Sequence, residues 1–524
     1  MISKISFTRI SVLFAVALLF ILAGSCEQEA KDNTTPSTSE IVIQNNQVVV
    51  SSLIGHGAQW GGYDLLPEWT GQKFFSQEDW NKLTRRIDFL KPRFVRIMID
   101  AGWNYAGEGY YDEQYKPERL LPILEYCQKN DITVLFGEWG HKYLNNTITD
   151  IKHEWVGWAA EYLNWLINDH GFTCIEYYNM VNEPNGNWST TDGNYRLWRD
   201  LMQEFSDSLS KKNLADDIVL TGPDIAVWDN GYLNWMDRTQ QDLGEQVGLY
   251  DIHTYPGQEF VRSGEFRNLL DAYQEAVPSG KQIVVSEIGF KYNEADGDLK
   301  EKNEQREDAD PYASDDSNMM VYDSFYGVDM ADAIIQAMLE GYAGAIVWNM
   351  DDAMYNSPDY EAGDSYAARK LKRWGFWNIL GDEVFADAPR GAIDEQKRPW
   401  FYTMSLLCRY FPDGMEVYDV ELPDKKGLRA VAGKYNDLYT LAIVNSNYSG
   451  YDNVVLRFEE GLELEGLKKY YFESQTGSRF KGNRDDQGFA MPEKTDLSLD
   501  LDEGERINIP GQSLTVYTSI SYQR

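Results

Sequence analysis

Two glutamates, each at the end of an apolar run, are the residues of this chain best placed to do chemistry. Glu183 lies in Asn182-Glu183-Pro184, directly after the run 175–181, and Glu287 follows the run 282–285. A carboxylate at the carboxyl end of a strand lies on the face where (β/α)₈ enzymes keep their reacting groups. Two such carboxylates on different strands could supply the acid and the nucleophile, or the acid and the base, that glycosidic bond cleavage needs. The pair therefore predicts chemistry on glycosidic bonds.

The two runs belong to a longer alternation of strand-like and helix-like segments. The strand-like runs are 53–55, 94–99, 132–136, 175–181, 218–221, 247–252, 283–285 and 343–348. They are apolar with little alternation, which is typical of parallel strands buried on both faces. Ser76 and Asp79 form a capping-box pattern before one helix, and helical spacing continues in 154–167, 195–209, 266–276 and 322–339.

Eight such units predict an α/β fold of the (β/α)₈ TIM barrel type. The rival is an open doubly wound sheet, which would normally carry a Gly-rich phosphate loop after its first strand, and none is present. The segment 291–317 is highly acidic and poor in large apolar residues, so we expect a surface insertion there. Its carboxylates Asp308, Asp310, Asp315 and Asp316 lack the spacing of an EF-hand calcium loop.

At 524 residues the chain exceeds the size of a single core, so a second domain is expected. After Pro399 the pattern changes to short strands separated by turn residues, which favours a small C-terminal β-sandwich. We therefore expect the barrel at 53–398 and the sandwich at 399–524. A hairpin at 41–52, turned at Asn45 and Asn46, could extend the sandwich.

The N-terminus carries an export signal. Lys4 and Arg9 precede the apolar run 10–22, and Leu22-Ala23-Gly24-Ser25-Cys26 resembles a bacterial lipobox. We expect a lipoprotein signal peptide at 1–26, a lipid on Cys26 and a flexible tether at 27–40. This would hold the protein to a membrane of the bacterial cell envelope. The alternative is an ordinary secretory signal that is cut nearby.

The amino-acid composition limits the classes of molecule that the protein is expected to bind. The net charge is −36, from 84 acidic and 48 basic residues, so nucleic acid is excluded as a partner and neutral glycans are favoured over polyanionic ones. The 16 Trp and 34 Tyr suit a cleft in which rings stack on sugars. Five histidines without metal-ligand spacing predict no catalytic metal or other cofactor. Cys127, Cys174 and Cys408 are expected to be buried thiols.

Counted from the N-terminus, Glu183 ends the fourth predicted strand and Glu287 the seventh. This arrangement resembles clan A of the retaining glycoside hydrolases, the "4/7" barrels of the cellulase-like superfamily. The resemblance implies that Glu287 is the nucleophile and Glu183 the acid and base, acting through a glycosyl-enzyme intermediate. It further implies that Arg96 is the cation beneath the nucleophile and that Asn182 contacts the sugar 2-hydroxyl. Tyr255 would hydrogen-bond the nucleophile, and Trp348 would form the platform under the reacting sugar.

Further residues follow strands and are candidates to contact substrate: His253, Trp139, Glu138 and Trp60, with His56, Gln59, Asp224 and Asp251 as weaker candidates. Each assignment has a structural alternative. Arg96 could be an ion-pair strut in the barrel floor, Tyr255 and Trp348 could be core aromatics, and Glu138 is a third carboxylate at the rim that could rival Glu183.

The sequence supports a retaining glycoside hydrolase that cleaves β-linked neutral glycans, leaning towards endo-β-glucanase-like action on a polysaccharide. One alternative is an exo-acting β-glycosidase of mannosidase, galactosidase or xylosidase type. Another is a non-catalytic glycan-binding lipoprotein at the cell surface. A peptidase or esterase lacks support, because no G-x-S-x-G motif or His-Glu zinc helix is present.

Overall fold

A computed structural model describes residues 39–61, 75–139, 147–356, 369–382, 385–386, 388 and 390–522. The expected signal peptide, Cys26 and most of the expected tether lie outside these residues. Within them, no helix has the length and apolar character needed to cross a bilayer.

Eight parallel strands form a barrel. They are β2 (Gly55–Ala58), β3 (Phe94–Ile99), β4 (Thr133–Glu138), β5 (Ile175–Asn179), β6 (Val219–Val227), β7 (Val247–Thr254), β8 (Gln282–Ile288) and β9 (Gly344–Val347). They pair in the order β2-β9-β8-β7-β6-β5-β4-β3. The two ends meet at a bridge between Gln59 and Arg96, where the Trp60 N–H donates to the Arg96 carbonyl at 2.8 Å. The predicted (β/α)₈ barrel is confirmed.

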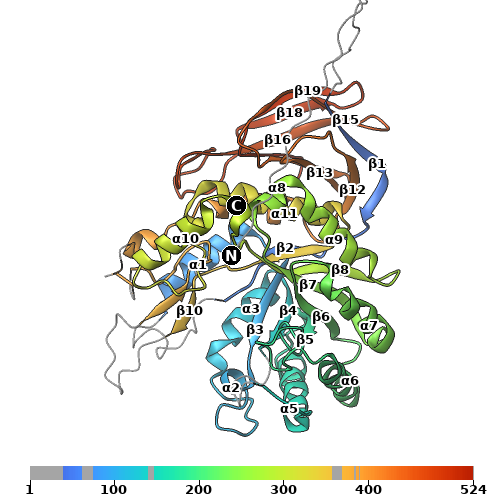
Figure 1. Ribbon diagram of the computed structural model, residues 1–524, viewed down its shortest axis with the longest axis vertical. Helices are drawn as coiled ribbons and strands as arrows, with labels where there is room; N and C mark the ends of the chain where they lie inside the picture. The colour runs from blue at the N-terminus through green and yellow to red at the C-terminus, as the bar shows by residue number, and fades with distance from the viewer. Residues whose placement is uncertain are drawn as a thin grey trace, which may run out of the picture. The chain divides into compact units, whose positions relative to one another are not determined.

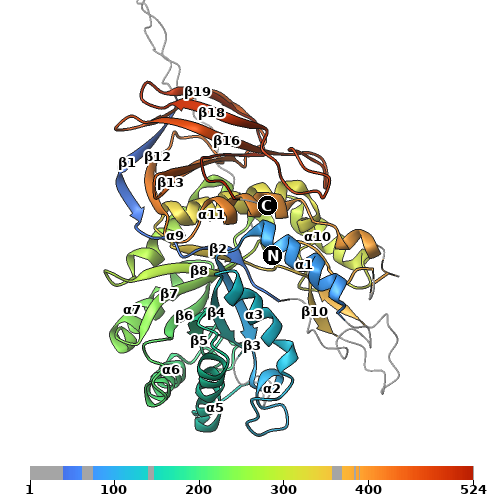
Figure 2. The same ribbon diagram turned by 180° about the vertical axis from the view of Figure 1, so that it is seen from behind.

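Helices cover the outside of these strands, as Figures 1 and 2 show most clearly for α5, α6 and α7. The described helices of the barrel are α1 (Gln77–Leu90), α2 (Ala101–Asn104), α3 (Leu121–Lys129), α5 (His153–Asn164), α6 (Tyr195–Lys211), α7 (Leu233–Leu243), α8 (Gln258–Ser263), α9 (Glu265–Glu275), α10 (Leu299–Ala309) and α11 (Ser324–Leu339). The α1 helix begins at the predicted capping box: the Asp79 N–H donates to the Ser76 side chain, and the Ser76 N–H to the Asp79 side chain. Each bond satisfies a backbone donor that a helix start leaves free.

The acidic segment 291–317 contains a helix, α10, that hydrophobic periodicity did not indicate. Leu299 is the one residue of α10 that is buried. Polar contacts support it instead, among them Lys302 with Asp298 at 2.7 Å and an ion pair of Arg306 with Asp323. Two of the four aspartates singled out in this segment form ion pairs: Asp310 pairs with Arg373 at 3.1 Å, and Asp316 lies 3.0 Å from Lys372.

The C-terminal part is a β-sandwich, as predicted, built from one connected set of strands. They are β12 (Glu416–Glu421), β13 (Leu428–Tyr435), β14 (Leu438–Asn445), β15 (Tyr451–Phe458), β16 (Glu463–Ser474), β17 (Phe480–Lys481), β18 (Lys494–Asp500), β19 (Glu505–Ile509) and β20 (Ser513–Thr518), joined by β1 (Glu40–Val50). Figure 1 shows β18 and β19 in one layer and β12 and β13 in the other. The strands β18 and β19 were not predicted, because their polar and apolar residues do not form an apolar run.

The hairpin expected at 41–52 is wrong. Residues 40–50 form a single strand that pairs antiparallel with β12 and parallel with β15, so β1 lies inside the sandwich sheet. Asn45 and Asn46, interpreted as a turn, are half-buried and exposed respectively, and the register with β12 shifts between Gln44 and Val48. A bulge accommodates these extra residues without reversing the chain.

The barrel and the sandwich meet through α11 and α12 (Trp400–Tyr410), which pack against each other. Every residue of α12 is buried. Polar contacts cross the same junction: Ser446 hydrogen-bonds Asp332, and Ser324 lies 2.8 Å from Ser474, hydroxyl to hydroxyl. The three cysteines of the described residues, Cys127, Cys174 and Cys408, are buried thiols as expected.

The segment after β9 is anchored by buried charges. It contains the hairpin β10 (Ala353–Asn356) and β11 (Lys370–Lys372). Asp352 accepts from the backbone N–H groups of Trp374 and Gly375 at 3.0 and 2.9 Å, and from Arg398 at 2.5 Å. Since Asp352 and Arg398 are almost fully buried, this network fixes Trp374 at the carboxyl face of the barrel.

Candidate active site

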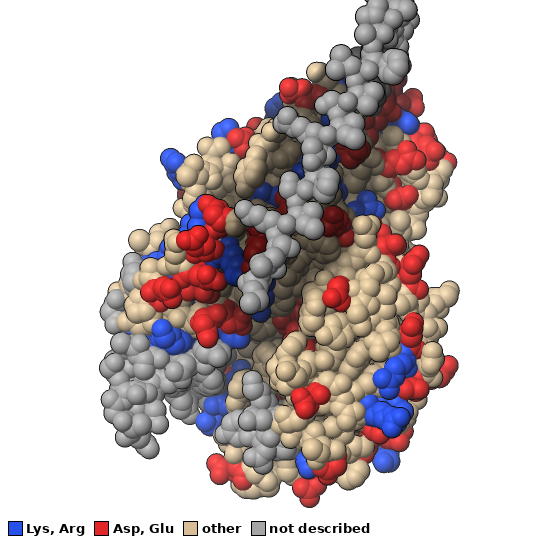
Figure 3. All heavy atoms as spheres, viewed as in Figure 1, with Lys and Arg blue, Asp and Glu red and all other residues tan. Residues whose placement is uncertain are grey.

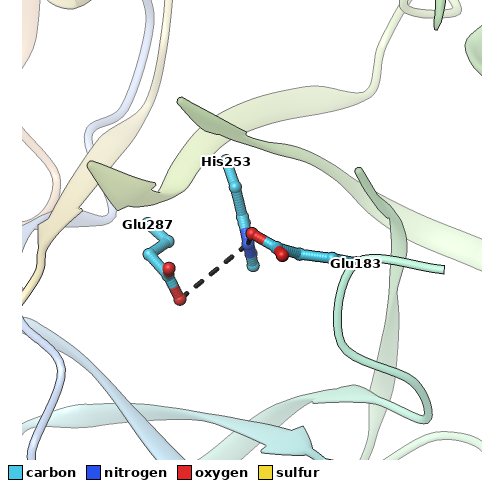
Figure 4. Close-up of side chains that lie close together, drawn as sticks. All are labelled: Glu183, His253 and Glu287. Atoms are coloured by element: carbon cyan, nitrogen blue, oxygen red, sulfur yellow. Dashed lines mark hydrogen bonds and ion pairs between the residues drawn. The ribbon is translucent and has the colours of Figure 1, made fainter. Parts of the chain in front are cut away.

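The two predicted glutamates converge at the carboxyl ends of the barrel strands. Glu183 follows β5, the fourth barrel strand, and Glu287 lies near the end of β8, the seventh. His253 of β7 lies between them, with Nδ1 3.0 Å from Glu183 Oε1 and 3.8 Å from Glu287 Oε2 (Figure 4). One carboxylate oxygen of Glu183 and one of Glu287 lie within 4.8 Å of each other. The two groups are thus close enough to act on one bond.

Glu287 is held by two donors. Arg96 Nη1 donates to its Oε2 at 2.8 Å, and the Tyr255 hydroxyl donates to its Oε1 at 2.5 Å. Arg96 is fully buried on β3 and also donates through Nη2 to Asn182 Oδ1 at 2.9 Å and to Asp224 at 3.1 Å. Burial lowers the pKa of Arg96, but Asp224 and Glu287 outweigh it and raise that pKa above its usual value. Arg96 is therefore a permanent cation under the nucleophile candidate.

Glu183 is held from three sides. Its backbone is left-handed, with φ 47°, and its N–H donates to Asp224 Oδ2 at 3.2 Å. Its Oε1 meets His253, and its Oε2 accepts from Trp188 Nε1 at 2.6 Å. A non-glycine residue with positive φ is uncommon and costs free energy. The hydrogen bonds that fix the backbone of Glu183 thus also fix the direction of its side chain.

Behind His253 runs a buried chain of acidic groups. Asp224, left-handed with φ 56°, accepts from His253 Nε2 at 3.0 Å, and its own N–H donates to Asp251 Oδ1 at 2.8 Å. The Ser286 hydroxyl donates to Asp251 Oδ2 at 2.7 Å. Asp224 and Asp251, weak candidates in the sequence, are both fully buried and orient the site from below.

The pKa directions follow from these contacts. Burial would lower the pKa of His253, but Asp224 raises it to about 10. Burial would raise the pKa of Glu183, yet the hydrogen bonds from His253 and Trp188 lower it. Burial raises the pKa of Glu287, reinforced by Glu183 and opposed by His253 and Arg96.

The pKa values of Asp224 and Asp251 shift in opposite directions. Burial and Asp224 raise the pKa of Asp251 well above its usual value. The pKa of Asp224 is lowered, because Arg96 and His253 outweigh its burial. Since Nε2 of His253 is committed to Asp224, Nδ1 is the atom that can exchange a proton with Glu183 Oε1, and the two side chains titrate as a pair.

A cavity of about 590 Å³ opens above the glutamates. Five tryptophans line it, and two of them, Trp188 and Trp228, are 53% and 54% exposed. Its described lining is Trp139, Asn182, Glu183, Trp188, Ser189, Thr190, Ala226, Val227, Trp228, His253, Thr254, Tyr255, Glu287, Lys291, Asp316, Trp348, Lys372 and Trp374. Exposed indoles beside paired carboxylates suit a ligand with flat apolar faces and many hydroxyls.

The structure brings most of the predicted site residues to this cavity and leaves three, Glu138, Trp60 and Arg96, outside its described lining. Glu138 is fully buried and accepts from Tyr178 at 2.9 Å, from Tyr105 at 3.1 Å and from the Ala101 N–H at 3.1 Å. Trp60 packs on Tyr126 and Trp80 instead. Arg96 lies beneath the carboxylates rather than in the lining.

Trp188, Trp228 and Lys372 line the cavity but had not been singled out from the sequence. All three lie in segments that follow barrel strands, so their places depend on how those segments fold. Lys372 and Lys291 lie 3.0 and 3.2 Å from Asp316 carboxylate oxygens, so one carboxylate serves both ammonium groups.

Two triplets bring possible metal ligands together: Glu183, His253 and Glu287, and Asp224, Asp251 and His253. In both, the nitrogens of His253 already meet carboxylate oxygens, and the Arg96 guanidinium contacts Glu287 and Asp224. A cation would compete with Arg96 for the same oxygens. The arrangement therefore favours proton transfer and nucleophilic attack over metal binding.

Glu138→Gln is expected to change the pH dependence of stability while preserving activity. Burial, with Asp100, raises the pKa of Glu138 from 4.5 to about 8. Between these values the folded protein keeps a proton that the unfolded chain has lost, so the stability contributed by Glu138 falls as the pH rises. Glutamine does not titrate. Urea unfolding from pH 5 to 8 should show the variant gaining stability relative to the wild type; a difference that stays constant would contradict the assignment.

Comparison with solved structures gives the class of this architecture, a (β/α)₈ barrel followed by a β-sandwich. A xylanase of glycoside hydrolase family 30 subfamily 8, Xyn30A from Clostridium acetobutylicum, is 13% identical with a TM-score of 0.59, over 91% of this chain and 99% of that one. The endo-beta1,6-glucanase BT3312 is 13% identical with a TM-score of 0.55, over 93% and 94% of the chains. An alpha-L-arabinofuranosidase from Thermotoga maritima is 14% identical with a TM-score of 0.59, over 92% and 99%.

These similarities establish the fold. The resemblance to the 4/7-barrel retaining glycoside hydrolases is thereby confirmed at the level of architecture. No protein-family model matches the chain, and no curated protein sequence matches it.

Proposed function

We propose that this protein is a retaining glycoside hydrolase. The observation that carries the proposal is the approach of Glu183 and Glu287 carboxylate oxygens to within 4.8 Å, from the fourth and seventh barrel strands. Carboxyl groups about 5–5.5 Å apart serve retention, whereas inversion needs about 6.5–9.5 Å to admit a water molecule.

In the first step, Glu287 attacks the anomeric carbon while Glu183 gives its proton to the leaving oxygen. The glycosidic C–O bond breaks, and an ester bond to Glu287 forms. Arg96 and Tyr255 hold the Glu287 oxygens, so that the carboxylate is aimed at the sugar. The proton comes from the Glu183–His253 pair, whose Oε1 and Nδ1 share it.

In the second step, Glu183 takes a proton from a water molecule that attacks the same carbon. The ester C–O bond breaks, the Glu287 carboxylate is restored, and Glu183 is protonated again. Because the negative charge of Glu287 is absent in the ester, Glu183 loses a nearby repulsive charge and becomes a base at that stage. Two inversions at one carbon give net retention.

The substrate we propose is a β-linked neutral glycan, cut internally in the manner of an endo-β-glucanase. Trp139, Trp348 and Trp374 line the cavity beside the carboxylates, and the exposed Trp188 and Trp228 extend this aromatic surface outward. Both cavity lysines are engaged by Asp316. Acidic side chains spread over the face in Figure 3, and the net charge of −36 disfavours polyanions as a bulk substrate. An exo-acting β-glycosidase and a non-catalytic glycan-binding protein are the alternatives.

A product assay decides among these functions. The protein would be incubated with β-glucans, xylan, mannan and galactan, and its products read by mass spectrometry, with Glu287→Ala as the control. Oligosaccharide ladders support endo action, while monosaccharide alone indicates an exo enzyme. Binding of one glycan without hydrolysis by the wild type would overturn catalysis and support the binding protein. NMR of early products reports the anomeric configuration.

Trp188→Phe is expected to shift the alkaline limb of the kcat/KM profile upward by about one pH unit. The indole N–H stabilises the charged form of Glu183, and a hydrogen bond to a charged group is worth roughly 1.5–3 kcal/mol when buried, less at this exposed position. Trp228→Phe is the matched control, because Trp228 lines the same cavity with similar exposure. Equal profiles for the two variants would contradict the role of Trp188.

We also propose that Cys26 carries a lipid that holds the protein to the bacterial cell envelope. The lipobox-like sequence before Cys26 supports this. Cys26→Ala is expected to move the protein from the detergent phase to the aqueous phase in Triton X-114 partition. Mass spectrometry of the wild-type N-terminal peptide should then show a diacylglyceryl cysteine; an unmodified terminus beyond residue 26 would contradict the proposal.

A further inference from the structure

A second groove lies along α1, away from the catalytic cavity. It consists of two adjoining cavities of about 620 and 390 Å³, which share Arg85, Gln487 and Phe489 as lining residues. One wall is formed by α1 together with Pro92, which precedes β3, and Ile132, which precedes β4. The other wall includes residues 485–489 of the C-terminal part. None of the lining residues is shared with the catalytic cavity.

Five cations line this groove without an acidic partner. Among the described residues, no carboxylate oxygen lies within 4.0 Å of the charged nitrogens of any of them: Arg85, Arg86, Lys91, Lys397 and Arg409. The chain carries 84 acidic residues against 48 basic ones, so acidic partners are abundant elsewhere. A cluster of unpaired cations in such a protein runs against its overall charge.

Neighbouring cations lower the pKa values of the two lysines in the groove. Burial, Arg93 and Arg409 lower the pKa of Lys91. Burial, followed by the neighbouring Arg86 and Arg484, lowers the pKa of Lys397 to about 8. Asp131 and Asp88 oppose the shift of Lys91, and Asp485 opposes that of Lys397, yet both pKa values stay below their usual ones.

Arg86 is the most informative member of the cluster. It is 8% exposed, and its Nη1 has no hydrogen-bond partner. Its guanidinium faces the ring of Trp377 at 5.0 Å. Burial lowers the pKa of Arg86 to about 10, so it remains charged at neutral pH. Arg409 is similar: it is 6% exposed, its Nη1 donates to the Phe89 carbonyl at 2.7 Å, and its Nε has no partner. Asp351 and Glu395 act on Arg86 only at a distance, so a bound oxyanion would give its buried guanidinium a direct partner.

We propose that this groove is a second ligand site, which binds a carboxylate or sulfate group of an acidic saccharide through Arg86 and Lys397. The guanidinium fork suits a planar carboxylate or a sulfate. Aromatic rings lie beside the cations: Phe89 stacks on Phe489 at 4.6 Å, and Tyr126 lines the same cavity. A free inorganic ion would fill a small part of one cavity, whereas a short saccharide can place its acid at Arg86 and its rings along Phe489.

The site does not depend on the proposed hydrolysis. The acidic sugar would be bound here and left uncut, while a neutral chain enters the catalytic cavity. Anionic and neutral sugars can occur in one glycan, so the groove would add affinity for acidic branches without admitting them to the glutamates.

The test is calorimetric titration of the full-length protein in a buffer free of sulfate and phosphate. The probes are tetragalacturonate, sodium sulfate and phosphatidylglycerol vesicles, and the variants are Arg86→Met and Lys397→Gln. Arg457→Gln is the matched control, because Arg457 lies on β15 and pairs with Glu40 at 3.4 Å. We expect saturable binding of tetragalacturonate that both variants weaken by at least about tenfold and the control does not, as for a lost charge-assisted hydrogen bond.

Thermal unfolding keeps the test independent of folding defects. Because Arg86 forms no ion pair, Arg86→Met without ligand should unfold at the same temperature as the wild type or higher. Tetragalacturonate should raise the Tm of the wild type but not that of Arg86→Met. Absence of tetragalacturonate binding overturns the proposal. So does binding of sulfate alone or of vesicles alone. Hydrolysis of the preferred neutral substrate should be unchanged in Arg86→Met, so failure of this site and failure of the catalytic assignment are separate results.

Discussion

Replacing Glu287 with alanine is expected to lower kcat/KM by at least about 10⁴-fold, the scale seen when a covalent nucleophile is removed. Arg96 and Tyr255 hold this carboxylate, which attacks the sugar in the proposed mechanism, and Glu183 offers a second carboxylate oxygen within 4.8 Å. Steady-state kinetics on an activated aryl glycoside measures the loss.

Azide distinguishes a lost nucleophile from a damaged fold. In Glu287→Ala the small anion can enter the vacated space and attack from the same side, which gives a glycosyl azide of inverted configuration. Glu138→Gln is the matched control, a neutral substitution at a buried glutamate that ends the strand β4 and accepts from Tyr105 and Tyr178. Activity of Glu287→Ala within tenfold of the wild type would exclude the nucleophile role.

Glu183→Gln is expected to lower kcat/KM by roughly 10²–10⁴-fold on substrates with poor leaving groups, the usual range for general acid catalysis. An activated dinitrophenyl glycoside needs no proton on its leaving oxygen, so formation of the ester should be nearly normal. Breakdown of the ester then becomes slow, and a burst of dinitrophenol should precede the steady state.

Azide should also distinguish the acid and base from the nucleophile, because its product from Glu183→Gln has the opposite anomeric configuration to that from Glu287→Ala. It attacks the ester after Glu287 has reacted, so the glycosyl azide retains the configuration of the substrate. The alkaline limb of the pH profile should vanish in Glu183→Gln, because the Glu183–His253 pair no longer supplies a titrating proton. An inverted azide product from this variant would show that the two roles were exchanged.

The barrel was predictable because its strands are buried on both faces and therefore read as apolar runs. Each predicted run overlaps or directly adjoins one of β2 to β9. The helix α10 was not predictable by the same signal, since it buries little beyond Leu299 and depends on ion pairs with distant residues such as Asp323. The reading of 41–52 as a hairpin failed because Asn45 and Asn46 suit a turn and a bulge equally, and only the partner strands decide between them.

The site followed the same division. His253 and Glu287 were singled out because they lie on strands or at their ends, where the register of a parallel barrel places reacting groups, whereas Arg96 was indicated by the family resemblance. Glu138 also follows this rule, but Tyr105 and Tyr178 accommodate its carboxylate below the cavity. Trp188 and Lys372 come from longer connections, whose paths depend on contacts that no local pattern encodes.

The position of β1 bears on how the protein carries mechanical load and how it is assembled. This strand precedes the barrel in the chain yet lies between β12 and β15, so the sandwich, which is synthesised after the barrel, completes its sheet with a strand that is synthesised before it. A pull on the chain before residue 39 would act along β1 and shear its ladder with the parallel β15. The load would therefore reach the sandwich first, and the barrel with its glutamates would be shielded from it.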